Sequence, residues 1–378
     1  MSPQPPPWPP SVRDLRAVFD AAGPYAVGIE DEVMLLAPDS FGLVARAPDV
    51  LRLLDRDPRF KLELPASQLE IVTPPLVNVT EAAAALLEGR RALAEAADGL
   101  ARPAAAGVHP FSSGVGELNL LPQYERTIRD YGPSARRQLV CALQVHVAVG
   151  GADRALAVFN AARSYLPLVA ALAANSPFYE GEDTGLASVR TKVGDLLPRH
   201  GVPPAIESWA AYAEAFRWGA ESGTFPDARS WWWDLRLHPG FGTLEFRVPD
   251  AQTSITDAAA IVAFVQALLA WLAEQRDGGA ELPVHPTWRI EENRWFACRD
   301  GVDGHMADLQ TGRLDSTRIR LEELLTELQP YGERFHSQQA LAHAAEMTER
   351  NGAIAQRHVA KRSNTAALAH WLAEQFLC

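Results

Sequence analysis

The segment 28-GIEDEVML-35 decides how the chain folds and where its polar chemistry lies. Its alternation of apolar and acidic residues predicts a β-strand with Ile29 and Val33 on one face. The two-residue period then places Glu30 and Glu32 together on the opposite face. Two carboxylates so placed repel each other unless a cation lies between them. By itself, the segment fits a solvated strand face as well as it fits a metal site.

Further acidic residues follow in 61-KLELPASQLEIVTPP-75. Glu63 and Glu70 lie on short extended pieces and have apolar neighbours. A carboxylate on an interior strand is costly unless it is paired or binds a metal ion. An ordinary one-sided sheet presents lysine, threonine and serine to solvent, whereas Lys61 is the one lysine on this face. The pattern therefore favours a cavity that is lined by these polar side chains.

An amide and an imidazole occupy another predicted strand, 141-CALQVHVAV-149. Gln144 and His146 share one face of this strand, and its opposite face is apolar. A lone histidine on a strand is more often a hydrogen-bonded core residue than a metal ligand. Its interpretation as a ligand therefore depends on the acids that neighbouring strands contribute.

Two arginines complete the polar face on a predicted hairpin formed by 232-WWDLRLHP-239 and 242-GTLEFRVPD-250. Glu245 and Arg247 share one face of its second strand, and Arg236 lies on the first. Guanidinium groups are forked donors for phosphate or carboxylate, which a simple metal cage does not contain. The hairpin therefore adds an anion-binding function to the cluster of acids.

Together, five carboxylates and one imidazole suit hard cations such as Mg²⁺ or Mn²⁺ better than zinc. Divalent ions bridge nucleotide phosphates and arginines hold the transferring group, so the set favours phosphoryl transfer from ATP. The sequence has no GxxxxGK[ST] motif and no GxGxxG that opens a helix. We therefore expect the nucleotide to bind outside a P-loop or a Rossmann fold.

The remaining pattern predicts an α+β fold with a largely antiparallel sheet covered by helices. The predicted strands are 25–36, 61–64, 68–73, 139–149, 231–238 and 242–249, with an extended piece near 305–313. The predicted helices are 12–22, 79–101, 153–174 with a bend or break at Pro167, 206–218, 255–275 and most of 288–377. Residues 175–204 read as a long irregular segment, and a loop of that length inside a compact domain is usually functional or else evidence against the assignment.

Composition excludes several classes of protein. The formal net charge of −12 and the pI near 5.4 disfavour binding to nucleic acid or to an anionic membrane. Three widely spaced cysteines argue against a disulfide framework or a cysteine-rich zinc site, and they favour the cytoplasm. The apolar stretch 258–273 contains Gln266 and fits a buried helix better than a membrane span.

The N-terminal residues MSPQPPPWPP predict a disordered, proline-rich leader over 1–10 and not a signal peptide. No repeat or linker follows, so we expect residues 11–378 to form a single catalytic domain. The run Trp231 to Trp233 supplies more aromatic surface than one strand face buries. Core packing is the expected explanation, and contact with a second copy in a homodimer is the alternative.

Six segments, in order, resemble the carboxylate–amine ligases of the glutamate–cysteine ligase type 2 family. They are GIEDE, ELPASQLEIVTPP, QVHVAV, 173-AANSPFYEGEDTGLASVR-190, 231-WWWDLRLHPGFGTLEFRVPDAQT-253 and 293-NRWFACRDG-301. The resemblance implies a glutamine-synthetase-like fold, whose curved antiparallel sheet forms an active-site funnel for ATP and divalent metals. It also implies that a carboxylate is activated as an acyl phosphate, which an amine attacks to give an amide, ADP and phosphate.

The resemblance also implies roles for individual residues. The implied metal ligands are Glu30, Glu32, Glu63, Glu70, His146 and Glu245. The implied catalytic residues are Arg247, as a phosphate or transition-state contact, and Arg236, as a substrate-carboxylate contact. The implied substrate- or nucleotide-binding residues are Gln144, Asn175 and, in the loop 181–190, Asp183, Thr184, Ser188 and Arg190. This loop is expected to close over the substrates, with an ordinary surface loop as the alternative, and Asp31 is expected to face away and to matter less.

Two alternative functions use the same residues. A binuclear metallohydrolase would place the carboxylates around two metals with water as the second reactant, but it would hardly require the arginine pair. A secondary-metabolism amide ligase would use an amine other than cysteine, and the sequence does not identify the amine. In the ligase interpretation the expected partners are amino acids and ATP.

Overall fold

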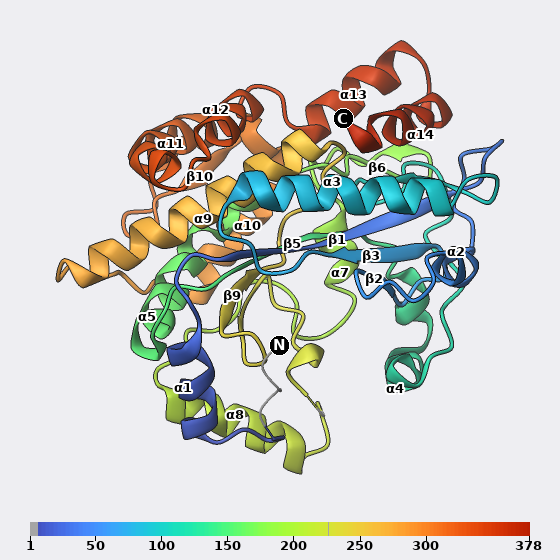
Figure 1. The fold of residues 1–378 in the computed structure, drawn as a ribbon. Coiled ribbons are helices and arrows are strands. Elements are labelled where there is room, and N and C mark those ends of the chain that lie inside the picture. The colour runs from blue at the N-terminus through green and yellow to red at the C-terminus, as the bar shows by residue number, and fades with distance from the viewer. Residues whose placement is uncertain (1–6, 226) are drawn as a thin grey trace.

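The computed structural model describes residues 7–225 and 227–378 (Figure 1). Its largest sheet has the order β2-β3-β1-β5-β9-β8, with β4 also paired to β1, and the pairings in it are antiparallel. Its strands are β1 (Val27–Leu36), β2 (Phe60–Leu62), β3 (Gln68–Val72), β4 (Arg102–Ala104), β5 (Leu143–Val147), β8 (Leu235–His238) and β9 (Thr243–Phe246). Two small hairpins combine β6 (Phe178–Tyr179) with β7 (Glu182–Asp183), and β10 (His305–Ala307) with β11 (Leu314–Ser316).

The α-helices are α1 (Val12–Ala21), α2 (Ala47–Leu53), α3 (Val79–Ala96), α4 (Pro122–Tyr131), α5 (Ala152–Ala162), α6 (Leu166–Leu172), α7 (Arg190–Gly194), α8 (Trp209–Glu221), α9 (Ile255–Asp277), α10 (Thr287–Asp300), α11 (Thr317–Arg334), α12 (Gln338–Met347), α13 (Gly352–Arg362) and α14 (Thr365–Glu374). Short 3₁₀ turns are η1 (Gly132–Arg137), η2 (Arg163–Tyr165), η3 (Ala228–Ser230), η4 (Gly301–Asp303) and η5 (Gln375–Leu377). Figure 1 shows α3 and α9 above the sheet and α1, α4 and α8 below it.

Apolar burial explains this arrangement. Strand β1 turns Ile29 and Val33 toward the buried side, where α3 packs on β1 and α9 packs on β5. Two helical stretches, Ala152–Leu172 and Ile255–Asp277, are apolar and long enough to cross a membrane, but 72% and 78% of their most apolar windows are buried in the fold. A helix that is apolar all round belongs in a core, so both stretches are core helices of a globular protein.

The polar side chain that the sequence places in the longest apolar helix is hydrogen-bonded through its amide nitrogen, whereas its Oε1 has no partner among the described residues. Gln266 of α9 is fully buried, and its Nε2 donates a hydrogen bond to the backbone carbonyl of Tyr25 at 2.8 Å. Cys141, Cys298 and Cys378 are free thiols, and the first two are buried. One continuous apolar cluster includes side chains from both ends of the chain, which favours the predicted single domain.

Several predicted boundaries differ from the structure. The predicted helix 153–174 is divided by η2, and Pro167 stands in the first turn of α6, where its missing N–H costs no helical hydrogen bond. The strand predicted from 231 begins at Leu235, because Trp231 instead stacks on Phe216 of α8, with ring centroids 4.7 Å apart. Helix α2, strand β4 and helix α4 form in stretches without a predicted helix or strand.

The predicted leader is described in part. Residues 1–6 lie outside the described residues. Trp8 packs edge-on against Phe216, with centroids 5.1 Å apart, and Pro10 is buried. Residues 7–10 are therefore part of the packed structure and not a disordered extension.

Candidate active site

Three carboxylates converge where β1, β3 and the β2–β3 connection meet. Glu32 and Glu70 are directly opposite each other in the antiparallel register, and one oxygen from each lies within 4.8 Å of one from Glu63. Burial and the neighbouring carboxylates raise the pKa of Glu63 well above its usual range. Burial and Glu30 raise the pKa of Glu70 to about 7, although Lys61 donates a hydrogen bond to it at 2.7 Å. A cluster of buried carboxylates with raised pKa values is typical of a cation-binding site.

A second group, Glu30, His146 and Glu245, lies beside the first on the same face of the sheet, and its ligand atoms are also within 4.8 Å of one another. His146 is buried, and its Nδ1 lies 3.0 Å from the hydroxyl of Thr243, which orients the ring. Its Nε2 is 3.6 Å from Glu30 and 3.9 Å from Glu245, and it has no hydrogen-bond partner within the described parts of the chain. A buried, unpartnered imidazole nitrogen between two carboxylates is suited to binding a metal ion.

The two arginines converge on Glu245, which is fully buried. Arg236 donates two parallel hydrogen bonds to it, at 2.5 and 2.8 Å, and Arg247 donates from Nη1 at 2.6 Å. Burial alone would raise the pKa of Glu245, but the two guanidinium groups hold it well below its usual range. Glu245 is therefore a carboxylate whose charge is already compensated by protein cations.

The two arginines differ in how much of the guanidinium is left for a ligand. Arg236 also donates to two backbone carbonyls, at 3.1 and 3.2 Å, so its fork is occupied by the protein. This arrangement makes it an anchor for Glu245, and the predicted substrate-carboxylate contact stays a prediction. Arg247 is 18% exposed, and its Nε and Nη2 donate to no group among the described residues. Of the two, Arg247 is therefore the one with donors available to a ligand.

Gln144 connects the two groups of ligands. Its Nε2 donates to Glu32 at 2.7 Å, and its Oε1 accepts a hydrogen bond from Arg247. Glu32 also accepts a hydrogen bond from the backbone N–H of Ala142 at 2.6 Å. The structure thus brings Gln144, Glu32 and Arg247 together on the polar face, where the sequence placed them.

The predicted lining residues from the 175–190 region instead contact other protein groups. Asn175 is fully buried, and its Nδ2 donates to the carbonyl of Ala251 at 2.8 Å. Ser188 and Arg190 both donate to Asp250, at 2.9 and 2.8 Å. Arg190 also donates to the backbone carbonyls of the three residues that follow β9, beginning with Arg247 at 3.0 Å. These contacts hold the strand end that carries Arg247, and direct ligand binding stays a prediction for these three residues.

The other two predicted loop residues are nearer the surface. Asp183 pairs with Arg357 of α13 at 2.7 Å, and the Thr184 hydroxyl donates to the carbonyl of Pro177 at 2.9 Å. Both contacts fold the loop onto the protein. A role of Asp183 and Thr184 over bound substrate therefore also stays a prediction.

Two residues that the sequence did not indicate hold Glu63 in place. Asn119 donates from Nδ2 to the Glu63 carbonyl at 2.6 Å, and the Tyr124 hydroxyl donates to the carbonyl of Leu62 at 2.8 Å. Asn119 lies in irregular chain, and Tyr124 lies in the first turn of α4, a helix without a prediction from the sequence. Their side chains fix the irregular connection from which Glu63 reaches the other two acids.

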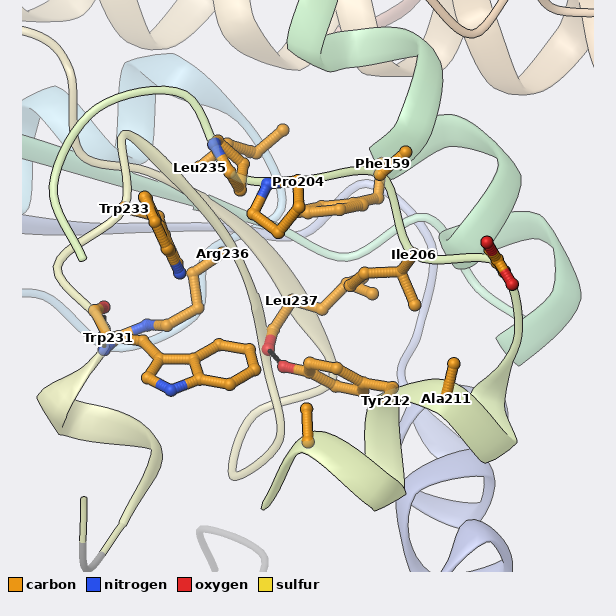
Figure 2. A pocket seen from close by; sticks show the side chains of 14 residues that line it. Phe159, Pro204, Ile206, Ala211, Tyr212, Trp231, Trp233, Leu235, Arg236 and Leu237 are labelled. Atoms are coloured by element: carbon orange, nitrogen blue, oxygen red, sulfur yellow. Dashed lines mark hydrogen bonds between the residues drawn. The ribbon is translucent and has the colours of Figure 1, made fainter. Parts of the chain in front are cut away.

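An apolar pocket of about 370 Å³ adjoins this site along the edge strand β8 (Figure 2). Trp231, Trp233, Tyr212 and Leu237 line it, and the Tyr212 hydroxyl donates to the Leu237 carbonyl. Arg236 also lines the pocket while it pairs with Glu245, so the pocket lies next to the charged face of the sheet.

Comparisons with known proteins agree with this geometry. The chain matches the model of glutamate–cysteine ligase family 2 (GCS2) over residues 26–372. A Rubrobacter xylanophilus protein named after glutamate–cysteine ligase 2-3 is 38% identical over 363 residues, which are 94% of this chain and 98% of the relative. A Gloeobacter violaceus protein named after glutamate–cysteine ligase 2 is 35% identical over 245 residues, which are 65% of this chain and 66% of the relative.

Solved structures share the fold at low sequence identity. The glutamate–cysteine ligase of Francisella tularensis, in complex with AMP, has a TM-score of 0.69 at 13% identity, and the match covers 93% of this chain and 89% of that chain. A bifunctional glutathione synthetase from Pasteurella multocida has a TM-score of 0.62 at 15% identity, over 97% of this chain and 53% of that chain. These matches confirm the predicted fold class, an antiparallel sheet of the glutamine-synthetase-like kind. The chain belongs to glutamate–cysteine ligase family 2 and is an ATP-dependent ligase that forms a C–N bond.

Proposed function

We propose that the chain activates the carboxylate of glutamate with ATP and joins it to the amine of cysteine, using Mg²⁺ or Mn²⁺ held by the carboxylate face of the sheet. The observation that carries this proposal is the pair of adjacent ligand groups on one face. A buried His146 Nε2 without a partner among the described residues lies in one group. The other group is made of Glu32, Glu63 and Glu70, where burial and the neighbouring carboxylates raise the pKa of Glu63.

The ligand types support a hard, divalent cation. Glu30, His146 and Glu245 would hold one ion, and Glu32, Glu63 and Glu70 would hold another. Such ions bridge the phosphates of a nucleotide and neutralise the charge that develops during phosphoryl transfer. The mostly carboxylate ligand set favours Mg²⁺ or Mn²⁺ over zinc.

The protein groups would then orient two successive displacements. An oxygen of the substrate carboxylate attacks the γ-phosphorus of ATP, so that an acyl phosphate forms and ADP leaves. The amine nitrogen next attacks the acyl carbon, the C–N bond forms, phosphate leaves and the nitrogen loses a proton. The free donors of Arg247 would be suited to the oxygens of the transferring phosphoryl group, because Arg247 lies beside Glu245 and, through Gln144, beside Glu32, two of the residues that would hold the cations.

The identity of the two substrates rests on kinship. The relatives are named after glutamate–cysteine ligase, so glutamate and cysteine are the first substrates to test. A secondary-metabolism ligase with another amine is the second candidate, and the apolar, aromatic pocket beside Arg236 favours testing larger apolar amines. Membership of a ligase family disfavours the alternative of a metallohydrolase.

Cellular context and assembly are also proposals. The free cysteines favour a cytoplasmic location. A homodimer stays the alternative explanation for the run Trp231 to Trp233, while Trp231 stacks on Phe216 of its own chain, as core packing predicts.

ADP release in the presence of Mg²⁺ tests the proposed function. Glutamate is supplied with a panel of amino acids that includes cysteine and larger apolar amines, and each substrate is also omitted in turn. We expect ADP release to require both a carboxylate and an amine, with glutamate and cysteine giving the highest rate. A higher rate with another amine would replace cysteine but retain the ligase. ADP release that is independent of every amine would contradict the ligase reaction.

A further inference from the structure

Three aromatic rings form a cluster at the turn between β8 and β9, next to one of the candidate cation-binding groups. Phe241 stacks on His238, with ring centroids 4.3 Å apart and an angle of 9° between the two planes. Both of these rings also meet the ring of His146 edge-on, with centroids 5.6 Å away. Because His146 belongs to a candidate cation-binding group, the cluster extends that group along the polar face of the sheet.

Phe241 is the most exposed ring of the cluster. It is 46% exposed, whereas His146 is buried and His238 is half-buried. By itself, an exposed phenylalanine needs no explanation. This one differs in its position, because it contacts a candidate metal ligand and His238 covers one face of its ring. A planar ligand would therefore stack on the other face.

The turn that carries Phe241 is held in place by the protein. The backbone N–H groups of Phe241 and Gly242 both donate to the carbonyl of His238, at 3.3 and 3.0 Å. Gly242 has a φ of 69°, and a Cβ at this position would lie 2.6 Å from the carbonyl oxygen of Val18 in α1. The N–H of Gly240 donates to Nδ1 of His238 at 3.2 Å, which orients the ring under Phe241. A ring that is fixed before binding lowers the entropy cost of holding a ligand.

Strand β9 leads from this turn into the candidate active site. Its two-residue period places Thr243 and Glu245 on the polar face, and Arg247 follows at the far end from the turn. Gln144 connects Arg247 to Glu32, so the second group of acids also lies toward that end. A nucleotide whose phosphates are bridged by the cations, with its γ-phosphate at Arg247, would therefore extend its nucleoside toward the turn.

The chemistry of the exposed ring is suited to a nucleobase. Aromatic side chains bind bases by stacking, because every base presents a flat π-face. Glutamate and cysteine, the first amino-acid substrates to test, have no planar ring that could stack in this way. Of the substrates of an ATP-dependent ligase, the nucleotide is thus the one that matches Phe241.

We propose that Phe241 is the stacking platform for the adenine base of ATP. The proposal rests on the proposed function, because the position of the cations determines where the phosphates lie. Phe241 would contact the base and none of the reacting atoms. Its role is therefore to favour a nucleotide over a phosphate compound that has no base, and it takes no part in phosphoryl transfer.

Calorimetric titration of the full-length chain with ADP, and separately with pyrophosphate, tests the proposal in the presence of Mg²⁺. Pyrophosphate contains the two phosphates of ADP but no base, so its binding reports the cation site alone. Phe241→Ala removes the ring, and we expect the Kd for ADP to rise by about 5- to 100-fold while the Kd for pyrophosphate stays that of the wild type. Phe241→Tyr keeps the ring and should bind ADP nearly as tightly as the wild type.

Trp288→Ala is the control, because it removes another exposed aromatic side chain, on α10, and should change neither Kd. Phe241→Leu keeps an apolar side chain without the ring and should show the same difference between the two ligands as Phe241→Ala, which covers the case of an unstable alanine variant. Melting temperatures establish that each variant is folded.

Two results would overturn the proposal while leaving the cation site intact or implicated. Unchanged ADP binding in folded Phe241→Ala and Phe241→Leu would show that the base does not stack on this ring. An equal loss of ADP and pyrophosphate binding would show that the ring acts on the cation site instead. If the wild type binds neither ligand with Mg²⁺, the proposed cation site is itself wrong and the platform is excluded with it.

Discussion

Arg90 of α3 donates from Nε to a carboxylate oxygen of Asp31 at 2.9 Å, and both side chains are fully buried. The remaining guanidinium nitrogens donate to the carbonyls of Gln252, Thr253 and Phe376. This one ion pair joins β1 to the start of α9 and to the C-terminal turn. The expectation that Asp31 faces away from the polar cluster is therefore confirmed, and its buried ion pair joins three parts of the core. That Asp31 matters less for catalysis stays a prediction.

Replacing Asp31 should lower the stability of the fold but leave catalytic turnover nearly unchanged. Asp31→Asn leaves the Arg90 charge buried without its counter-ion, so we expect the free energy of unfolding to fall by about 3 kcal/mol. ADP release per folded molecule should stay near that of the wild type, because the side chain faces away from the ligands. Denaturant titration combined with turnover at a temperature where the variant is folded measures both. A fully stable Asp31→Asn would contradict the structural role.

Removing divalent cations should abolish activity and lower stability at neutral pH. Without cations, Glu32, Glu63 and Glu70 repel one another in a small volume. We expect Mg²⁺ or Mn²⁺ to restore ADP release after chelation and to raise the melting temperature, and zinc to be unnecessary. Turnover that persists after exhaustive removal of magnesium and manganese would show that the ligand assignment is wrong.

Arg247→Lys keeps a positive charge near Glu245 but loses the forked guanidinium. A lysine cannot bond Gln144 and Glu245 and also offer two free donors, so we expect kcat to fall by about 10- to 1000-fold. Steady-state ADP release, with the melting temperature as a folding control, checks this expectation. A kcat close to that of the wild type in a folded variant would exclude a phosphoryl contact by Arg247.

His343 should make part of the stability depend on pH. The hydrogen bond from its ring to Asp257 is the main cause of a pKa raised above the ordinary value of 6.5. A raised pKa in the folded state means that this stabilisation is complete below 6.5 and is lost as the pH rises through the folded value. Melting temperatures across this range should therefore decline more in the wild type than in His343→Gln. Parallel declines would show that another group is responsible.

Periodicity in the sequence was sufficient to predict the strand faces. The alternation around Glu30 and Glu32 fixed which side chains share a face, and the register confirms it by pairing Glu32 with Glu70. It could not predict contacts between segments far apart in the sequence, such as those that Asn119 and Tyr124 make near Glu63. Such contacts depend on how those segments pack in space, which leaves no repeating pattern in the sequence.

The same limit applies to polar residues that a shared motif identifies. Asn175 and Asp31 both belong to segments that resemble the family, yet both are buried and bonded to the protein framework. A motif shows that a residue type is required at a position. It does not show whether the side chain faces the ligand or the core, because only the packing of distant segments such as α3 decides that.

Steady-state ADP release by Glu30→Gln, Glu32→Gln and Asp31→Asn at saturating Mg²⁺ tests the central claim most directly. Glu327→Gln, an exposed change on α11, serves as the control, and melting temperatures establish that each variant is folded. Because an amide carries no charge to offset a cation, both glutamine variants on β1 should lose most or all turnover, and they should be at least as stable as the wild type without metal. Asp31→Asn should turn over per folded molecule like the control. An active Glu30→Gln together with an inactive but folded Asp31→Asn would contradict the assignment of the polar face as the catalytic one.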